Sequence, residues 1–260
     1  MKTTAIEAAR TAGEVLQKYY TQQLDVKTKS NPFDLVTQAD LEADHTATAL
    51  IAQQFPDHAF WTEETGHNGS DSPYTWLLDP LDGTTNFVHR IPHFAVALAV
   101  LHYRQPILAV TFDPVRYELF VAEKGHGCTL NGKPVTVSAV TAPGDALTAT
   151  GFAPLRDYGS EGEKNLRRIH TMLNATHGVR DSGSAALNMA YVAAGRLDVY
   201  WTLRLSPWDW VGGALMVEEA GGTVTAFDGS PWTVDTVGVL VTNGALHTTA
   251  YRLLHQNKAG

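Results

Sequence analysis

The sequence predicts a mixed α/β fold whose two halves differ in character. In the first half, apolar or alternating runs separated by turn residues, at 94–102, 105–112 and 117–123, indicate an antiparallel meander packed on helices. In the second half, predicted strands and helices alternate, which is typical of a layered α/β arrangement. We therefore expect an α+β half at residues 1–142 and an α/β half at residues 143–260.

The elements of the first half follow from periodicity and turn chemistry. A first helix is predicted from residues that recur at helical spacing, namely Ile6, Ala9, Gly13, Leu16 and Tyr20. Residues 26–36 indicate a strand and a loop, after which Thr37 is predicted to cap a helix ending near Phe55. The dipeptide Asn131-Gly132 predicts a hairpin turn of the primed type.

The second half begins near residues 141–145, where Pro and Gly mark a change of composition. Periodicity predicts helices at 164–174, 184–194 and 207–219, and strands at 177–181, 197–201, 223–227 and 237–242.

Bulk composition limits the classes of partner. The net charge of −8 argues against a nucleic-acid backbone or an anionic membrane as the main partner. Cys128 is the only cysteine, so no internal disulfide forms, and a reducing cytoplasm is the expected compartment. No apolar run approaches the roughly 18 residues of a membrane span.

One stretch, residues 76–92, contains several side chains that could bind a metal ion or a phosphate. A predicted buried strand delivers Asp79 and Asp82 into a turn that contains Pro80 and Gly83. Hydroxyl and amide groups follow at residues 84–86, where backbone N–H groups suit an anion. Hard oxygen ligands beside an anion site indicate Mg²⁺ that holds a phosphate. The alternative is that Asp-Pro and Asp-Gly are ordinary turn dipeptides.

The run Asp-Pro-Leu-Asp-Gly-Thr-Thr-Asn-Phe at residues 79–87 closely resembles the signature of the inositol monophosphatase family. These are Mg²⁺-dependent, lithium-sensitive phosphatases, and the resemblance extends from about Asn31 to Gly222. It implies a layered αβαβα sandwich of the sugar-phosphatase type with the active site between the two halves. It also implies a homodimer, which we carry as an expectation.

Two acidic positions upstream of the signature match the family. The run Asp34-Leu-Val-Thr37-Gln-Ala-Asp40 resembles a family pattern that implies a hydrogen bond between Asp40 and the active-site Thr84. From the residues alone, an acid in the first turn of a helix such as Asp40 is usually a capping or helix-dipole residue. Glu63 matches a family metal ligand, although Thr62 replaces the usual glycine and paired acids in a loop are ordinarily solvated.

Two further segments match the family downstream. The junction at residues 181–186 is rich in small residues, and the resemblance assigns contacts with substrate hydroxyls to Gly183, Ser184 and Ala185. Helix packing alone would also explain these small residues. Asp209 stands in a second signature at residues 207–222, where the resemblance implies a metal ligand and the residues alone suggest a helix cap.

The resemblance implies a mechanism with two or three Mg²⁺ ions, for which Mn²⁺ could substitute. One ion would take Glu63, Asp79 and the Leu81 carbonyl, and a second would take Asp79, Asp82 and Asp209. We expect in-line attack of a metal-activated water on a phosphomonoester, with no phosphoenzyme. The groups that orient the water would be Glu63, Thr84 and Asp40, while N–H groups of Gly83 and Thr84 would bind phosphate oxygens.

The expected substrate is a small phosphorylated metabolite, a sugar or cyclitol phosphate. Inositol-specific members carry a glutamate seven residues before the second signature aspartate, and this chain has Thr202 there. Arg204 could meet a second phosphate, or it could be an exposed loop cation. The alternatives are therefore the same chemistry on a bisphosphate or NADP, and a non-catalytic regulator that binds metal and phosphate.

Overall fold

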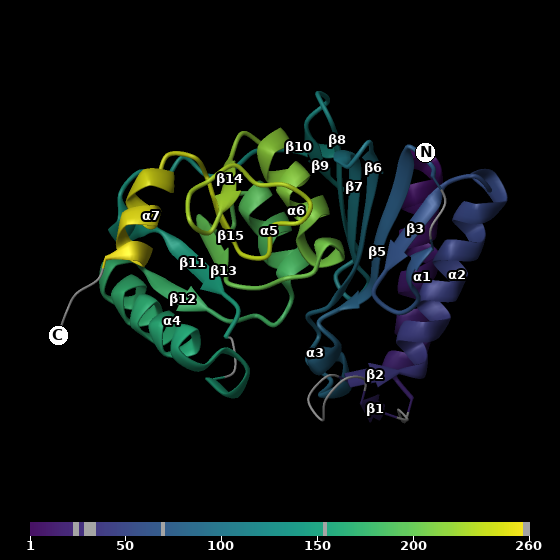
Figure 1. Ribbon diagram of the computed structural model, residues 1–260, viewed down its shortest axis with the longest axis horizontal. Coiled ribbons are helices and arrows are strands. Elements are labelled where there is room, and N and C mark those ends of the chain that lie inside the picture. Colours follow the sequence, from purple (N-terminus) through teal and green to yellow (C-terminus); the bar gives the residue numbers. More distant parts are fainter. Residues whose placement is uncertain (23–25, 29–34, 69–70, 153–154, 257–260) are drawn as a thin grey trace.

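A computed structural model describes residues 1–22, 26–28, 35–68, 71–152 and 155–256 of the 260-residue chain. The elements form five layers, with helices outside, two sheets inside them and a helical layer in the middle (Figure 1). This order confirms the predicted αβαβα sandwich. Asp34, matched above to a family pattern, lies outside the described residues.

The first outer layer consists of two helices, α1 (Lys2–Tyr20) and α2 (Gln38–Gln54). Their contact faces are rich in alanine, and the buried positions include Ala5, Ala8, Ala9 and Ala12 of α1 with Ala39, Ala43 and Ala47 of α2. Small side chains allow the two helices to lie close together on one face of the first sheet. Thr37 caps α2 as predicted, because its side chain accepts a hydrogen bond from the Ala39 N–H.

The first sheet has eight strands in the order β10-β9-β8-β7-β6-β5-β3-β4. Its strands are β3 (Ala59–Thr62), β4 (Gly66–Asn68), β5 (Tyr74–Asp82), β6 (Ala95–His102), β7 (Gln105–Asp113), β8 (Glu118–Glu123), β9 (Cys128–Leu130) and β10 (Lys133–Val135). Strands β5 to β10 pair antiparallel in chain order, which confirms the predicted meander. Asn131 and Gly132 both have positive φ, 49° and 77°, as a primed turn requires.

The second sheet has five strands in the order β12-β11-β13-β15-β14. They are β11 (Leu147–Thr150), β12 (Gly178–Arg180), β13 (Val199–Thr202), β14 (Thr223–Ala226) and β15 (Val239–Thr242). β11 pairs parallel with β12 and β13, and β15 pairs antiparallel with β13 and β14. The outer layer on this side is α4 (Leu155–Ala175) and α7 (His247–His255) (Figure 1).

The middle layer consists of α5 (Ala185–Ala193) and α6 (Pro207–Glu219), which lie between the two sheets (Figure 1). Nearly every residue of α5 is buried, because a helix covered on both sides must be apolar all round. Both helices join residues of β5–β9 and β13–β15 in one hydrophobic cluster. The division of the chain at residue 142 stays a prediction, since the two parts share this core.

Four short elements complete the fold. They are the hairpin strands β1 (Val26–Thr28) and β2 (Leu35–Thr37), the short helix α3 (Thr84–Val88) and the 3₁₀ turn η1 (Pro143–Asp145). Sequence patterns missed β4, β11 and α7. The segment of β11, Leu-Thr-Ala-Thr, is too short and too weakly apolar to be recognised without its neighbours.

Strand β5 differs in length from the expectation. The predicted turn at Pro80 is part of the strand, which continues to Asp82 with an irregular register between Asp79 and Asp82 opposite β6. A proline is tolerated there because a bulge removes the need for its missing N–H. None of the described helices is both long enough and apolar enough to cross a membrane.

Candidate active site

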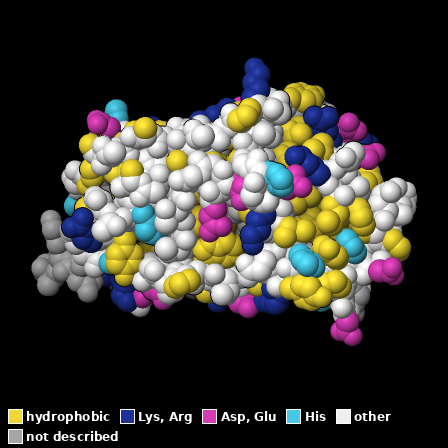
Figure 2. All heavy atoms as spheres, turned by 90° about the horizontal axis from the view of Figure 1, so that it is seen from above, with side chains coloured by type: hydrophobic (Ala, Val, Ile, Leu, Met, Phe, Trp, Pro, Cys, Tyr) yellow, Lys and Arg dark blue, Asp and Glu magenta, His cyan; other side chains and the backbone are white. Residues whose placement is uncertain are grey.

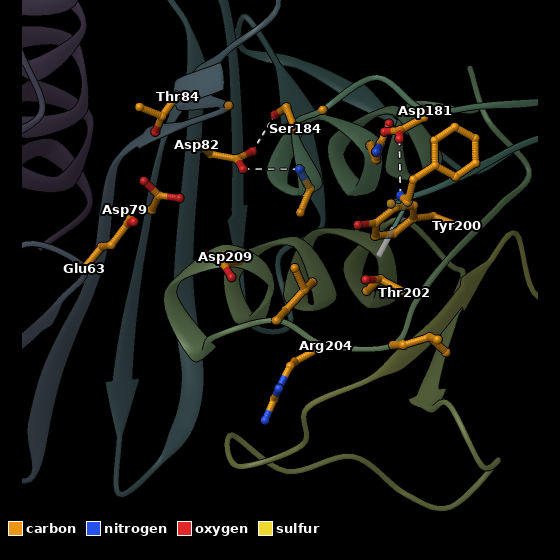
Figure 3. A pocket seen from close by; sticks show the side chains of 18 residues that line it. Glu63, Asp79, Asp82, Thr84, Asp181, Ser184, Tyr200, Thr202, Arg204 and Asp209 are labelled. Atoms are coloured by element: carbon orange, nitrogen blue, oxygen red, sulfur yellow. Dashed lines mark hydrogen bonds between the residues drawn. The ribbon is translucent and has the colours of Figure 1, made fainter. Parts of the chain in front are cut away.

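The predicted site residues gather around one cavity of about 300 Å³. It is lined by Glu63, Asp79, Asp82, Gly83, Thr84, Gly151, Phe152, Asp181, Gly183, Ser184, Ala185, Asn188, Tyr200, Thr202, Leu203, Arg204, Leu205 and Asp209 (Figure 3). Of the residues predicted from sequence, only Asp40 and Leu81 do not line it. Both lie buried behind the wall, at 1% exposure each.

One side of the cavity, which we call the acidic wall, carries the carboxylates of Glu63, Asp79, Asp82 and Asp209, and Asp79 occupies its buried part. Its side chain is 2% exposed, and its Oδ1 accepts a hydrogen bond from the Leu81 N–H at 2.9 Å. Burial raises the pKa of Asp79 well above its usual range, and the neighbouring charge of Glu63 raises it further. The bulge in β5 therefore holds a carboxylate where its ionised form is costly unless a cation compensates it.

Asp82 is turned from β5 toward the start of α5. The Ser184 hydroxyl donates to its Oδ2 and the Ala185 N–H donates to its Oδ1 at 3.2 Å (Figure 3). The Ala186 N–H also donates to Oδ2, at 2.8 Å. Burial raises the pKa of Asp82 to about 6, although these three donors act in the opposite direction. The small residues at this junction thus bring the two parts of the chain together.

Thr84 begins α3 just after Gly83, whose φ of 99° favours glycine. The Thr84 hydroxyl donates to the Leu81 carbonyl at 3.1 Å and lies 3.5 Å from Asp40 Oδ1. The predicted contact with Asp40 is present at the outer limit of a hydrogen bond, and Leu81 is the nearer acceptor. Asp40 is also a cap, because its Oδ2 accepts from the Thr37 N–H at 2.9 Å.

Glu63 lies in the turn that leaves β3, and its backbone N–H donates to the Leu78 carbonyl at 3.1 Å. The threonines on either side of the Glu63-Glu64 pair hold this turn. Thr62 Oγ1 donates to Asp44 Oδ2 at 3.2 Å and accepts from the Thr65 N–H at 3.0 Å. Asp44 is 1% exposed, and its Oδ1 has no hydrogen-bond partner among the described residues.

Asp209 occupies the first turn of α6, where Pro207 begins the helix. Its Oδ2 accepts a hydrogen bond from the Ser206 N–H at 2.7 Å, so the capping role expected from sequence is present. The same residue also lines the cavity, which the cap alone would not require. Trp208 packs edge-on against Trp61 of β3, with ring centroids 6.1 Å apart, and so couples the start of α6 to the first sheet.

The opposite wall of the cavity contains groups that the sequence analysis missed. Tyr200 of β13 is 2% exposed, and burial strongly raises the pKa of its phenol. Strand alternation could have identified it, because residues two apart face the same side as Thr202. Asp181 and Phe152 also line this wall, on loops that follow β12 and β11. No periodic pattern indicates such loop residues.

The donor set fits a hard divalent cation by its chemistry. The cavity is lined by the carboxylates of Glu63, Asp79, Asp82 and Asp209, and each of them offers oxygen atoms as ligands to a metal ion. As the side chains stand, however, no three His, Cys, Asp or Glu residues in the described part of the chain are placed to hold one ion together. The four carboxylates repel one another when they are ionised, and Asp82 accepts hydrogen bonds from N–H groups of α5 rather than facing the other three acids. Binding a cation would draw these groups together.

The fold and the cavity define a class of protein, a layered protein of helices and two sheets with an acidic site suited to a divalent cation and a phosphate ester. The sequence profile described as the inositol monophosphatase family matches residues 1–259. The chain therefore belongs to the inositol monophosphatase family, whose members are phosphatase enzymes.

Individual relatives agree with this assignment. The chain is 42% identical to "Nus factor SuhB" of Pseudomonas aeruginosa over 88% of this chain and 86% of that protein. It is 40% identical to "Inositol-1-monophosphatase" of Synechocystis sp. over 94% of this chain and 84% of that protein. Among solved structures, an inositol monophosphatase from Anabaena has 40% identity, a TM-score of 0.87 and coverage of 97% and 94%. The extragenic suppressor protein suhB from Bartonella henselae has 34% identity and a TM-score of 0.93, with 98% of both chains covered.

Proposed function

We propose that the chain is a Mg²⁺-dependent phosphomonoesterase that hydrolyses a small sugar or cyclitol phosphate. The observation that carries the proposal is one cavity with a wall of four carboxylates on one side and hydroxyl-bearing side chains on the other (Figure 3). Its volume, about 300 Å³, is at the small end of the roughly 300–1,000 Å³ found for ligand pockets. A small monophosphate suits this space better than a dinucleotide such as NADP.

Each residue has a role in the proposed reaction. Mg²⁺, when bound, supplies Lewis-acid polarisation of the phosphate and lowers the pKa of water. The ligands would be Glu63, Asp79, Asp82, Asp209 and the Leu81 carbonyl. The Thr84 hydroxyl can rotate so that it donates to Asp40 instead of to the Leu81 carbonyl. Its oxygen would then accept a hydrogen bond from the attacking water and orient it. Backbone N–H groups of Gly83 and Thr84 would bind phosphate oxygens.

A bisphosphate remains the second candidate because of Arg204. Its guanidinium lies at the edge of the cavity and points away from the carboxylates (Figure 3). Among the described residues it has no hydrogen bond or ion pair, so it is available to a second phosphate. Arg204→Ala would lower kcat/KM for bisphosphates more than for monophosphates if this reading holds, and equally for all esters if it does not.

The candidate of a different class is a regulator that binds metal and phosphate without catalysis, and one relative carries the name "Nus factor SuhB", which does not describe a phosphatase. We favour the enzyme because the Thr84 hydroxyl lies 3.5 Å from Asp40 Oδ1, a pairing that could orient water and that a binding protein would not need. We expect no nucleic-acid partner, since the net charge is −8 and Lys and Arg side chains are dispersed over the face in Figure 2. We also propose that the protein is cytoplasmic, forms a homodimer and is inhibited by lithium.

One assay tests the proposal. Phosphate release is measured from inositol 1-phosphate, fructose 1,6-bisphosphate, NADP and phenyl phosphate, each with Mg²⁺, with Mn²⁺ and with a chelator. We expect activity on the cyclitol phosphate that chelation abolishes and Mg²⁺ restores. Activity indifferent to chelation would refute the metal mechanism, and no release from any ester would favour the regulator.

A further inference from the structure

One carboxylate in the cavity is not used by the proposed metal site. Five acidic residues line the cavity, and four of them form the proposed ligand set. The fifth, Asp181, lies across the cavity from Glu63 and Asp79, on the same side as Tyr200 (Figure 3). It follows β12 and precedes the Gly183–Ala185 junction, so it stands where a substrate held by its phosphate would extend away from the acidic wall.

The Asp181 side chain is held in place but is not saturated. Its Oδ2 accepts a hydrogen bond from the Phe152 N–H at 3.2 Å, and burial raises the pKa of Asp181 although the N–H groups of Phe152 and Gly183 act in the opposite direction. A carboxylate offers about four acceptor positions. These two N–H groups take at most two of them, so acceptor positions remain for a ligand, and the carboxylate is exposed to receive one.

The groups around Asp181 suit hydroxyls better than a second phosphate. Tyr200 and Thr202 are buried at 2% and 5% exposure and supply neutral hydroxyl groups to the same wall. A carboxylate accepts hydrogen bonds from neutral hydroxyls but repels a phosphate of like charge. Arg204 is the cationic group of the lining, and in Figure 3 it points away from this wall.

We propose that Asp181 is a specificity-determining residue that accepts hydrogen bonds from hydroxyls of a neutral polyol carrying a single phosphate. The inference rests on the proposed function, because it concerns the substrate of the same cavity. Asp181 provides the carboxylate of this wall, on a different segment from the neutral hydroxyls of Tyr200 and Thr202. The substrate class is therefore a cyclitol or sugar monophosphate with free hydroxyls on the side remote from its phosphate.

The test compares two esters and three variants. The ratio of kcat/KM for inositol 1-phosphate to kcat/KM for phenyl phosphate is measured for the unaltered chain, Asp181→Asn, Asp181→Ala and Asp228→Ala. Asp228 is the matched control, an exposed aspartate outside the cavity whose Oδ1 accepts from the Ser230 N–H at 2.9 Å. Hydrogen bonds to charged groups predict a fall in the ratio on the order of 10- to 100-fold for Asp181→Ala. Asp228→Ala should leave the ratio as it is.

Asp181→Asn separates recognition from a structural role. Asparagine keeps an oxygen that can accept from the Phe152 N–H, so a purely structural role predicts a normal ratio for Asp181→Asn, and equal losses on both esters for Asp181→Ala. Recognition predicts a lower ratio in both variants. Deoxy analogues of inositol 1-phosphate give a second readout, since removing the contacted hydroxyl should cost the unaltered chain much more than it costs Asp181→Ala.

The outcomes distinguish this inference from the proposed function. If the unaltered chain hydrolyses neither ester, the proposed function fails. If it hydrolyses both and the Asp181 variants keep the same ratio, Asp181 does not select the substrate, while the phosphatase assignment stands.

Discussion

Asp82, the last residue of β5, accepts a hydrogen bond from the Ala186 N–H in α5 at 2.8 Å. The bond connects the first sheet to the middle helical layer at the edge of the cavity. Asp82 is 9% exposed and also receives the Ser184 hydroxyl, so the start of α5 compensates a buried carboxylate. A cation that draws Asp82 toward Asp79 would compete with these donors, which makes metal binding and this junction interdependent.

The stability of the metal-free protein should fall as pH rises from about 4 to 6. The pKa of Asp82 is about 6 in the folded chain against 3.8 in the reference state, so the folded state holds its proton over that window and the unfolded state does not. Unfolding then releases a proton, and the free energy of unfolding decreases with pH by roughly 3 kcal/mol at most.

Denaturant unfolding in chelator at several pH values, for the unaltered chain and Asp82→Asn, checks this sign. The difference between the two curves reports Asp82 together with its effect on the pKa of Asp79, because the contribution of buried histidines such as His93, whose pKa is lowered by burial, is common to both proteins. Parallel curves would mean that Asp82 does not carry the effect.

Substitutions of Asp209 should separate its cap from its chemistry. Asparagine keeps an acceptor for the Ser206 N–H and alanine does not, while both remove the charge. We expect both variants to lose activity by two orders of magnitude or more if the carboxylate is a ligand. Only Asp209→Ala should also lose roughly 1 kcal/mol of stability from the broken cap. Thermal melts with chelator, compared with phosphate release in Mg²⁺, give the two readouts, and full activity in Asp209→Asn would contradict the assignment.

Thr62→Val should loosen the turn that carries Glu63. The substitution removes the hydroxyl that Asp44 and Thr65 share and leaves a buried carboxylate less satisfied, which costs about 1–3 kcal/mol. The Mg²⁺ concentration for half-maximal thermal stabilisation should rise, because Glu63 is the next residue. Thr48→Val is the control, since its hydroxyl bonds only to carbonyls of its own helix. An unchanged Mg²⁺ midpoint in Thr62→Val would exclude this role.

Gly83→Ala should destabilise the chain more than Gly221→Ala. Both glycines have positive φ, 99° and 89°, so backbone strain is similar. A Cβ on Gly83 would lie 3.1 Å from the His93 carbonyl oxygen and 3.2 Å from that of Gly183, whereas Gly221 has nothing within 4 Å. We expect each substitution to cost about 1 kcal/mol from strain, with an additional loss only for Gly83. Equal melting temperatures for the two variants would refute the close approach.

Local sequence patterns predicted most of the fold, because the spacing of apolar residues and the identity of turn and capping residues are visible within a short stretch of sequence. The meander, the primed turn at Asn131-Gly132 and the cap at Thr37 follow from such signals. Strand β11 and helix α7 were missed because their weakly apolar segments are stabilised by the second sheet and α4. Tertiary packing decides such elements, and a single sequence does not show it.

The acids of the site were identified by motif, but their partners were not. The sequence indicated that Asp79, Asp82 and Asp209 would meet. It did not indicate that Asp82 would turn toward Ser184, or that Thr84 would lie nearer to Leu81 than to Asp40. Those contacts depend on side-chain rotation and on repulsion among carboxylates, which spacing along the chain does not encode. Asp181 and Tyr200 join the cavity through loop and strand placement alone.

The wall formed by Asp181, Tyr200 and Thr202 comes from different segments than Glu63, Asp79 and Thr84. Under the proposed roles, substitutions of Asp181 or at the end of β13 would change which ester binds, whereas a substitution of Ser184, in the same loop as Asp181, would also disturb Asp82. Such a layout would let one set of hydrolytic residues act on different metabolites over evolutionary time, because the proposed selectivity residues and the proposed metal ligands are encoded by mostly separate stretches of the gene.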